Sequence, residues 1–332
     1  MARKIVVVGA GIAGLTAARR LTGADGSADG SAEVVVLDKG RGVGGRVATR
    51  RIGEATLDHG AQFLTTHTPD FAETVAGWER AGVVRPWFRG RIGPQGVLEA
   101  DGHVRYRGAP TMNAIARHLA IGLDVRLGTR VTAVQPDGER WIVRTDGPGA
   151  RDLAADVLVL TTPVPQALDL LAAGGVDLAA TDREALGAVR YDPCLALLAP
   201  LHGPSGLAHP GAVDPDAGPI EWMADNHTKG VSGTVAVTLH ADAAYSHEHW
   251  TASVDVIAAD LLAAAGLRSG AIHELVQVQR WRYARPTVLH AQRCLVADLT
   301  PALVLAGDAF GEAKIEGAAL SGAAAAEAVA AL

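Results

Sequence analysis

The hydrophobic positions near the start of the chain change from the pattern of a strand to that of a helix and back. Lys4 to Val8 is a short, continuous apolar run, which is typical of a buried strand. Ile12 to Leu21 places its apolar residues at helical spacing, and Glu33 to Leu37 forms a second apolar run. This order of strand, helix and strand predicts the first unit of an α/β domain.

The next part of the chain alternates between helical and strand patterns. Pro69 to Ala81 predicts a helix, and residues 97–108 predict a hairpin that turns at Asp101–Gly102. Pro110 stands where an amphipathic helix is expected to begin. These elements therefore separate the opening strands from the later part of the same domain.

Later segments predict a return to strands. A pair of strands is expected around a turn at Asp137–Gly138, followed by a buried strand in residues 156–163. From about Gln166 to Tyr283 the strands alternate apolar and polar residues, with one long helix in residues 251–266. Residues 302–332 then contain an apolar run and an alanine-rich helix.

This succession predicts two domains, of which the first is discontinuous. The first is expected to comprise residues 1–64, 106–165 and 286–332. The second is expected to comprise residues 65–105 and 166–285 and to contain a mostly antiparallel sheet.

A glycine-rich turn lies between the first strand and the first helix. Gly9, Gly11 and Gly14 match the pattern G-x-G-x-x-G. The first glycine permits a tight turn, the second lets a diphosphate approach the backbone, and the third lets the helix pack on the sheet. Asp38, at the end of the second strand, is placed to hold ribose hydroxyls. These residues predict a dinucleotide-binding domain, and the helix N-terminus adds positive potential.

A second glycine-rich segment favours FAD over NAD as the dinucleotide. Gly44–Gly45, followed by Arg46, offers free backbone and a cation to the diphosphate of an extended ligand. Thr161–Pro163 closes a buried strand, and Gly307–Asp308 lies where a late strand meets a helix, with its acid able to reach ribityl hydroxyls. That helix begins near Gly317, and its dipole can stabilise negative charge on reduced flavin. FAD is therefore the expected cofactor.

The residues expected to contact FAD lie in these segments and their neighbours. They are Gly9, Gly11, Ile12, Ala13, Gly14, Asp38, Lys39, Gly45, Arg46, Gly60, Ala61, Gln62, Phe63, Val131, Thr162, Gly307, Asp308, Glu316, Gly317, Ala318 and Ser321. Cys294 lies in an apolar context, which is typical of an unreactive buried thiol. We therefore expect FAD to be bound noncovalently.

Charge and composition exclude several classes of protein. The formal net charge of −6 argues against an extended nucleic-acid surface, which needs a basic excess. The two cysteines, Cys194 and Cys294, form no CxxC motif, and the histidines show no metal-binding spacing. No apolar run reaches the roughly 18 to 20 residues of a membrane span. We expect a cytoplasmic protein that binds neither metal, nucleic acid nor membrane.

Motifs along nearly the whole chain resemble the renalase-like branch of the flavin amine oxidase superfamily. They are "VVVGAGIAGL", "LDKGRGVGGRVATRR", "DHGAQF", "LTTPVPQ", "QRWRYARP" and "GDAFGEAKIEGAALSG". The resemblance implies a Rossmann-like FAD-binding domain of the amine-oxidase type with an antiparallel substrate domain. It also implies oxidation of mis-reduced isomers of NAD(P)H, with the electrons passed to O2 to give H2O2.

Hydride transfer from a dihydropyridine to flavin needs no strong protein base, because aromatisation of the pyridine drives it. This agrees with a sequence that shows no Ser-His-Asp, metal or paired-carboxylate pattern. By the resemblance, Gly60, Ala61 and Gln62 line the flavin, and Gln62 donates or accepts a hydrogen bond on the substrate side.

Three further residues are candidates for the catalytic site. Trp281 and Tyr283 alternate with arginines along one strand, so they form a stacking wall with an arginine for a substrate phosphate, or Trp281 packs between the lobes. His240 ends an alternating strand and either faces the pocket or is structural.

Two other functions stay open from the sequence. The first is an amine oxidase or dehydrogenase acting on another small amine, for which an aromatic cage and a lysine behind the flavin N5 are expected. The four lysines, Lys4, Lys39, Lys229 and Lys314, show no clear match to that position. The second is a noncatalytic module that binds FAD or another nucleotide.

Overall fold

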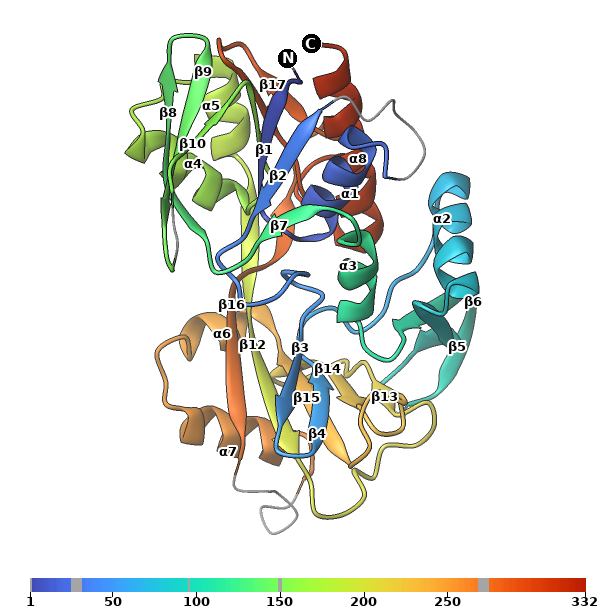
Figure 1. Ribbon diagram of the computed structural model, residues 1–332. Coiled ribbons are helices and arrows are strands. Elements are labelled where there is room, and N and C mark those ends of the chain that lie inside the picture. The colour runs from blue at the N-terminus through green and yellow to red at the C-terminus, as the bar shows by residue number, and fades with distance from the viewer. Residues whose placement is uncertain (1, 25–31, 95, 149–150, 268–274) are drawn as a thin grey trace. The chain divides into compact units, whose positions relative to one another are not determined.

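The computed structural model describes residues 2–24, 32–94, 96–148, 151–267 and 275–332. The chain forms two compact units whose segments alternate along the sequence (Figure 1). Unit 1 contains Met1–Gly45, Ala116–Arg190 and Pro286–Leu332, and unit 2 contains Arg46–Ile115 and Tyr191–Arg285. Both units are therefore assembled from segments that are far apart in the sequence.

Unit 1 is built on a six-stranded sheet with the strand order β17-β18-β11-β1-β2-β7. Five neighbouring strands are parallel, and β17 is antiparallel to β18 at one edge. The strands are β1 (Lys4–Val8), β2 (Glu33–Leu37), β7 (Asp124–Arg126), β11 (Val157–Leu160), β17 (Leu295–Ala297) and β18 (Ala302–Leu305). The predicted strands near the N-terminus are confirmed, and their continuous apolar sequence is that of parallel strands buried on both faces.

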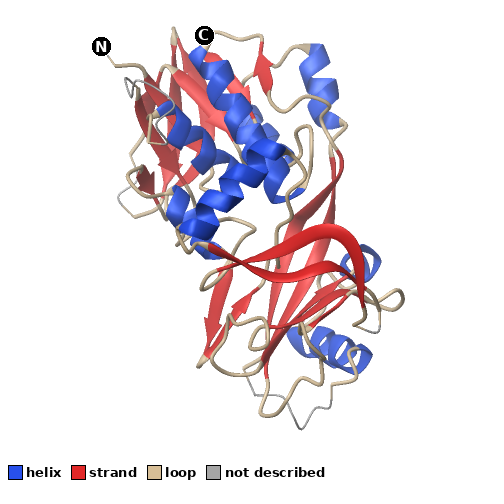
Figure 2. Cartoon of the chain, turned by 90° about the vertical axis from the view of Figure 1, so that its right-hand side faces the viewer, coloured by secondary structure: helices blue, strands red, loops and turns tan. Residues whose placement is uncertain are grey.

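Helices of unit 1 lie against this sheet (Figure 2). The first helix, α1 (Ile12–Leu21), packs directly on the last one, α8 (Lys314–Ala330). A Cβ atom on Gly322 of α8 would overlap the backbone oxygen of Ala13, so the two helix backbones touch at this glycine. The N-terminal and C-terminal segments of the chain thus form one layer.

A smaller antiparallel sheet completes unit 1, with the order β10-β9-β8. Its strands are β8 (Arg130–Asp137), β9 (Arg140–Asp146) and β10 (Leu153–Ala155), and helix α4 (Val164–Ala173) contacts β8. Helix α5 (Ala180–Gly187) follows α4. The predicted turn at Asp137–Gly138 is confirmed, because Gly138 adopts a φ of +59° between the paired ends of β8 and β9.

Unit 2 contains a five-stranded sheet with the order β13-β14-β15-β12-β16. The pairs β13/β14, β14/β15 and β12/β15 are antiparallel, as the alternating sequence predicted. The strands are β12 (Arg190–Pro200), β13 (Ala212–Val213), β14 (Ile220–Asp225), β15 (Ala236–Ala241) and β16 (Gln277–Val288). Helices α6 (Ala243–Glu248) and α7 (Val254–Ala264) are capped by Asp242 and Ser253, and Ile257, Leu261 and Leu262 of α7 join the core of this sheet.

Two hairpins and two helices complete unit 2. The hairpin β3 (Thr49–Ile52) and β4 (Ala55–Asp58) packs on the sheet through a cluster of Ile52, Ala55, Leu57, Leu198 and Ala236. The second hairpin consists of β5 (Val84–Ile92) and β6 (Leu98–Gly108), and helix α2 (Pro69–Arg80) contacts β5. Helix α3 (Asn113–Leu119) begins shortly after Pro110 and spans the boundary to unit 1.

The predicted hairpin turn at Asp101–Gly102 is wrong. These residues lie inside β6, which pairs with β5 as one long strand. Gly102 adopts a φ of +79°, and the register skips from Arg89↔Val104 to Arg91↔Glu99, so the extra residues of β6 form a bulge. An Asp-Gly pair supplies the same left-handed backbone to a bulge as to a turn, which is why the sequence pattern was ambiguous.

The compact units differ from the predicted domain boundaries in three segments. Residues 46–64 and 106–115 belong to unit 2, and residues 166–190 belong to unit 1. The first difference follows from the apolar contact of β3 and β4 with the five-stranded sheet. The assignment of segments to a cofactor domain and a substrate domain stays a prediction. Within the described ranges, no helix combines the length and the hydropathy needed to cross a bilayer.

We expect Gly322→Ala to lower the stability of unit 1, because the added methyl group meets the Ala13 backbone rather than a movable side chain. Overpacking of this kind typically costs about 1–3 kcal/mol. Gly187→Ala in α5 is the matched control, since its Cβ would meet nothing within 4 Å. Urea unfolding of both variants tests this, and an equal midpoint for the two would contradict the close helix contact.

Candidate active site

The predicted cofactor residues of unit 1 gather at one edge of the parallel sheet. Gly9, Asp38, Thr162 and Gly307 follow the carboxyl ends of β1, β2, β11 and β18, which are neighbours in the sheet. Because parallel strands end at the same edge, four segments distant in sequence come together there. This edge is where open α/β sheets bind their ligands.

The turn between β1 and α1 brings backbone close to backbone. Gly9 has a φ of +113°, and a Cβ atom there would lie 2.7 Å from Thr161 Oγ1. A Cβ on Gly14 would overlap the Gly9 carbonyl oxygen, whereas one on Gly11 would meet nothing within 4 Å. Gly9 and Gly14 are thus required by packing, and the space beside Gly11 is open at the helix N-terminus, where Ile12 and Ala13 begin α1.

Asp38 fixes this turn relative to β2. Its Oδ2 accepts a hydrogen bond from the Ala10 N–H at 2.7 Å, and its Oδ1 accepts one from the Gly40 N–H at 2.6 Å. Each carboxylate oxygen retains a lone pair for a ribose hydroxyl. Lys39 is exposed, and its Nζ lies 3.5 Å from Gln166 Oε1.

The second glycine-rich segment packs on the first. The Gly44 N–H donates to the Ala10 carbonyl at 2.8 Å. Gly45 adopts a φ of +54°, and a Cβ atom there would be 3.7 Å from Gly11 Cα. The two glycine loops therefore form one backbone surface, as a ligand that extends past the first turn requires.

The late strand and the last helix of unit 1 meet beside Thr162. The Gly307 N–H donates to Ser321 Oγ at 2.8 Å, and Gly307 has a φ of +144°. Thr162 Oγ1 is buried and has no partner among the described residues. The other predicted residues here are placed on the same elements: Asp308 follows β18, the buried residues Glu316, Gly317 and Ala318 lie in the first turns of α8, and Val131 is buried in β8.

In unit 2, Arg46 is linked to the segment after β4 and to β16. The Ala61 N–H donates to the Arg46 carbonyl at 2.8 Å, and a Cβ on Gly60 would overlap that same carbonyl oxygen. Arg46 Nη1 donates to the Tyr283 carbonyl at 3.1 Å. Thus the structure brings Arg46, Gly60, Ala61 and Tyr283 together within this unit.

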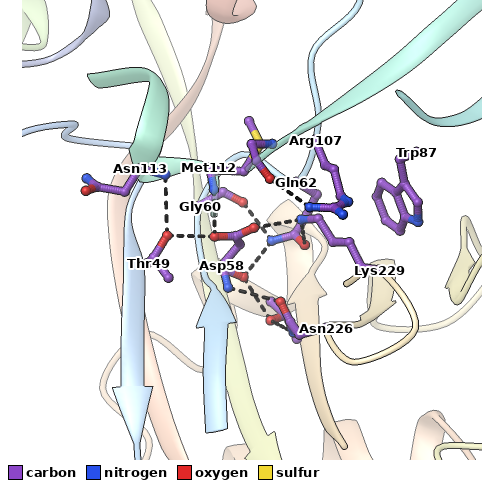
Figure 3. A network of polar contacts seen from close by, with 12 residues as sticks. Thr49, Asp58, Gly60, Gln62, Trp87, Arg107, Met112, Asn113, Asn226 and Lys229 are labelled. Carbon is purple, nitrogen blue, oxygen red and sulfur yellow. Dashed lines mark hydrogen bonds and ion pairs between the residues drawn. The ribbon is translucent and has the colours of Figure 1, made fainter. Parts of the chain in front are cut away.

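A buried ion pair between Asp58 and Lys229 lies next to this segment (Figure 3). Both side chains are 0% exposed, and Lys229 Nζ is 3.0 Å from Asp58 Oδ2. Asp58 Oδ1 accepts hydrogen bonds from Thr49 Oγ1 at 2.6 Å and from the Met112 N–H at 3.1 Å. Burial lowers the pKa of Lys229, and the adjacent Asp58 carboxylate opposes that shift.

Gln62 joins the ion pair and is itself only 5% exposed. Its Nε2 donates to the carbonyls of Asp58 and Gly60 at 2.7 and 3.0 Å, and its Oε1 accepts from Lys229 Nζ at 3.2 Å. Both amide hydrogens are therefore used inside unit 2. In this arrangement Gln62 can only accept a further hydrogen bond, through the second lone pair of Oε1.

His59, Trp281 and His240 form a second cluster. Trp281 Nε1 donates to the His59 carbonyl at 2.9 Å, and the two rings stack with centroids 5.4 Å apart. Burial lowers the pKa of His59 to about 4, with the Arg50 charge acting in the same direction. Burial also lowers the pKa of His240 to about 4, although a hydrogen bond to the His59 backbone opposes it. Both imidazoles are neutral at pH 7.

These two histidines retain unused hydrogen-bonding atoms. Among the described residues, His59 Nδ1 and His240 Nε2 are buried and have no partner. Buried polar atoms without a partner carry a desolvation cost, so a bound molecule or water at this place is expected to contact them.

The side chains of β16 alternate as predicted, but its arginines are engaged elsewhere. Arg280 donates to the carbonyls of Trp250 and Ala252 at 3.0 and 2.6 Å, and Arg282 lies over the Trp250 ring. Tyr283 packs edge-on against Tyr191. The face of β16 that carries Trp281 and Tyr283 therefore does not receive the arginine that the sequence suggested for a substrate phosphate.

The remaining candidates are also located. Phe63 packs against Phe88 and Trp222. Cys294 is half-buried, and burial raises the pKa of its thiol, which disfavours the reactive thiolate. Within the described part of the chain, no group of three or more His, Cys, Asp or Glu side chains is arranged to hold a metal ion.

Sequence reasoning missed Asp58, Lys229 and the residues that support them. Asn226 Oδ1 accepts from the Asp58 N–H at 3.0 Å, and Thr238 Oγ1 donates to the Asp58 carbonyl at 2.9 Å. The signal that could have drawn attention to Asp58 is its position at the start of "DHGAQF", where an acid follows the apolar residue of a strand.

Comparison with known proteins places the whole chain in one structural group. A sequence model described as flavin containing amine oxidoreductase matches residues 89–330, and one described as NAD(P)-binding Rossmann-like domain matches residues 7–76. The solved structure of a putrescine oxidase bound to putrescine is 17% identical, with a TM-score of 0.73 over 99% of each chain. A candidate protoporphyrinogen oxidase from Exiguobacterium sp. 255-15 is 14% identical, with a TM-score of 0.71 over 99% of each chain. At such identities the likeness is one of fold.

Lys229→Met is expected to destabilise unit 2 strongly, because it leaves the Asp58 carboxylate buried without its cation. Breaking a buried pair in this way typically costs about 3–5 kcal/mol. Lys4→Met is the matched control, since Lys4 pairs with Glu33 on the surface and such pairs contribute about 1 kcal/mol or less. Urea unfolding measures both. The double variant Asp58→Asn/Lys229→Met should lose less than the sum of its single changes, and strict additivity would show that the charges are not coupled.

Acid should destabilise unit 2 through His59 and His240. Their folded pKa values, about 4, lie below the ordinary value of 6.5, so the unfolded chain binds more protons between these limits. This stability is complete above about pH 6.5 and is lost as the pH falls toward 4. His240→Gln should flatten the decline of the urea midpoint over this range, whereas His247→Gln, at an exposed position of α6, should leave it unchanged. Identical pH profiles for wild type and His240→Gln would refute this.

Proposed function

Because the chain belongs to the flavin containing amine oxidoreductase family, we propose that it is an oxidase of renalase type, which oxidises mis-reduced dihydro isomers of NAD(P). The protein is a flavin-dependent oxidoreductase, and its cofactor is FAD. The proposal adds to these statements the substrate, the use of O2 as electron acceptor and the roles of individual residues.

Unit 1 fits a noncovalently bound FAD. The open space beside Gly11 and the unbonded amides at the N-terminus of α1 suit a diphosphate, and Asp38 suits ribose hydroxyls. Thr162 Oγ1 is a buried polar atom that still needs a partner. When bound, FAD supplies hydride acceptance at N5 and transfer of the electrons to O2 with release of H2O2.

The substrate is proposed to meet the residues of unit 2. Trp281 presents a ring that is fixed by its hydrogen bond to the His59 carbonyl, which suits stacking against a flat pyridine ring. Gln62 would accept a hydrogen bond through Oε1, and His240 Nε2 would contact a polar group of the substrate. Tyr283 would extend the aromatic wall beyond Trp281.

The observation that carries the proposal is the absence of a free base among these described groups. His59 and His240, with pKa values near 4, are neutral but weak bases at pH 7, and Lys229 is bonded to Asp58. A dihydropyridine gives up hydride without deprotonation, because the product ring becomes aromatic. Orientation over the acceptor is then the main task of the protein, and rigid aromatic side chains perform it.

We expect the yellow holoprotein, under anaerobic conditions, to be bleached rapidly by the 2- and 6-dihydro isomers of NAD(P)H and only slowly by ordinary NADH or simple amines. Readmission of air should restore the colour and yield H2O2. Stopped-flow absorbance follows the first step. Rapid bleaching by amines alone would point instead to an amine oxidase, and a protein that takes up no FAD would exclude both.

A variant tests the role of the aromatic wall. Trp281→Phe keeps a ring but loses the hydrogen bond that orients it, and misplacement of a reacting ring is expected to slow flavin reduction at least about tenfold. Trp250→Phe, which alters the ring beneath Arg282, is the matched control and should reduce at the wild-type rate. Equal rates for the two variants would remove Trp281 from the proposed site.

A further inference from the structure

Two arginines of the hairpin β5–β6 lie side by side in unit 2. Arg85 on β5 and Arg107 on β6 are directly opposite in the antiparallel register, so their side chains leave the same face of the hairpin. Like charges in this position repel each other. Their juxtaposition therefore needs either a nearby acid or a bound anion to offset it.

Arg107 is held in place rather than free in solvent. It is half-buried, and its Nη1 donates to the Gly108 carbonyl at 3.1 Å. A Cβ atom on Gly230, where φ is +78°, would lie 2.9 Å from Arg107 Nη2, so this glycine makes room for the guanidinium. Burial and the Arg85 charge both lower the pKa of Arg107, which places the two cations close together.

No acid is available to neutralise this pair. The carboxylate nearest in effect on Arg107 is Asp58, which is already bonded to Lys229, Thr49 and Met112. Among the described residues, neither Arg85 nor Arg107 forms an ion pair, whereas Arg105 on the same hairpin is paired with Asp101. In a chain with a net charge of −6, such a local excess of positive charge is specific to this place.

An aromatic side chain lies beside these cations. Trp87 is shown next to Arg107 and Lys229 in Figure 3, and Lys229 Nζ is 5.0 Å from its ring centroid. Trp87 Nε1 donates to the Pro210 carbonyl at 2.9 Å, which fixes the ring. The surroundings of Arg107 thus consist of two further cations and a rigid indole.

We propose that Arg85 and Arg107 bind a phosphate or diphosphate group of the substrate. Guanidinium groups donate paired hydrogen bonds to phosphate oxygens, and two neighbouring forks match a diphosphate. This inference rests on the proposed function, since it names the part of a dinucleotide substrate that unit 2 holds. It also replaces Arg280 and Arg282, which are engaged with Trp250 and Ala252, as the source of phosphate contacts.

The test is calorimetric titration of FAD-loaded protein with inorganic pyrophosphate, so that the phosphate site of the cofactor is already filled. Arg85→Gln and Arg107→Gln should each weaken pyrophosphate binding about tenfold or more, as expected for loss of hydrogen bonds to a charged group. Arg89→Gln is the matched control, because Arg89 is an exposed arginine of β5 opposite Val104. Since Arg85 is exposed, its variant is expected to fold even if Arg107→Gln does not.

Further arms separate the possible outcomes. Sodium acetate should bind much more weakly than pyrophosphate, and equal binding would indicate a carboxylate site instead of a phosphate site. Arg85→Gln should also raise KM for the 6-dihydro isomer of NADH without changing KM for the corresponding phosphate-free riboside. No pyrophosphate binding in the wild type, or equal affinity in all variants, would overturn the proposal. If the dihydro isomers are not substrates at all, the titration still decides whether the arginine site exists.

Discussion

The burial of two opposite charges, Asp58 and Lys229, is the constraint on which the site in unit 2 depends. Neither charge is stable alone without water, so the two must remain in contact. Their contact joins the end of β4 to the segment after β14. Through Gln62 and the Gly60 carbonyl, it also fixes the path of the backbone that follows β4. The local chain has few alternatives to this path, because every donor of the lysine–glutamine pair is directed at a particular acceptor.

The electrostatic design of unit 2 follows from this pair. The one buried carboxylate is neutralised by its lysine, and the two buried histidines are neutral because burial lowers their pKa values to about 4. What remains is an uncompensated pair of arginines on the neighbouring hairpin. An environment of this kind suits a substrate that carries negative charge at a distance from its reacting ring and needs no proton removed there.

The sequence predicted the fold of unit 1 well because its determinants are local. Apolar runs specify the strands, and Gly9, Gly11 and Gly14 specify the turn between β1 and α1. The ion pair of unit 2 could not be predicted in the same way, since Asp58 and Lys229 are separated by 171 positions and nothing in the neighbourhood of Lys229 marks it as buried. Likewise, Asp101–Gly102 has the composition of a turn, and only the pairing of β5 with β6 shows that it forms a bulge.

The contact between α1 and α8 has a consequence for how the protein is made. Strand β18 and helix α8 are among the last segments to leave the ribosome, yet β18 lies beside β11 within the sheet and α8 covers the first helix. All segments of unit 2 are translated before them. Unit 2 can therefore acquire its structure during synthesis, whereas the nucleotide-binding edge is finished only after translation, and loading of the cofactor has to follow release of the complete polypeptide.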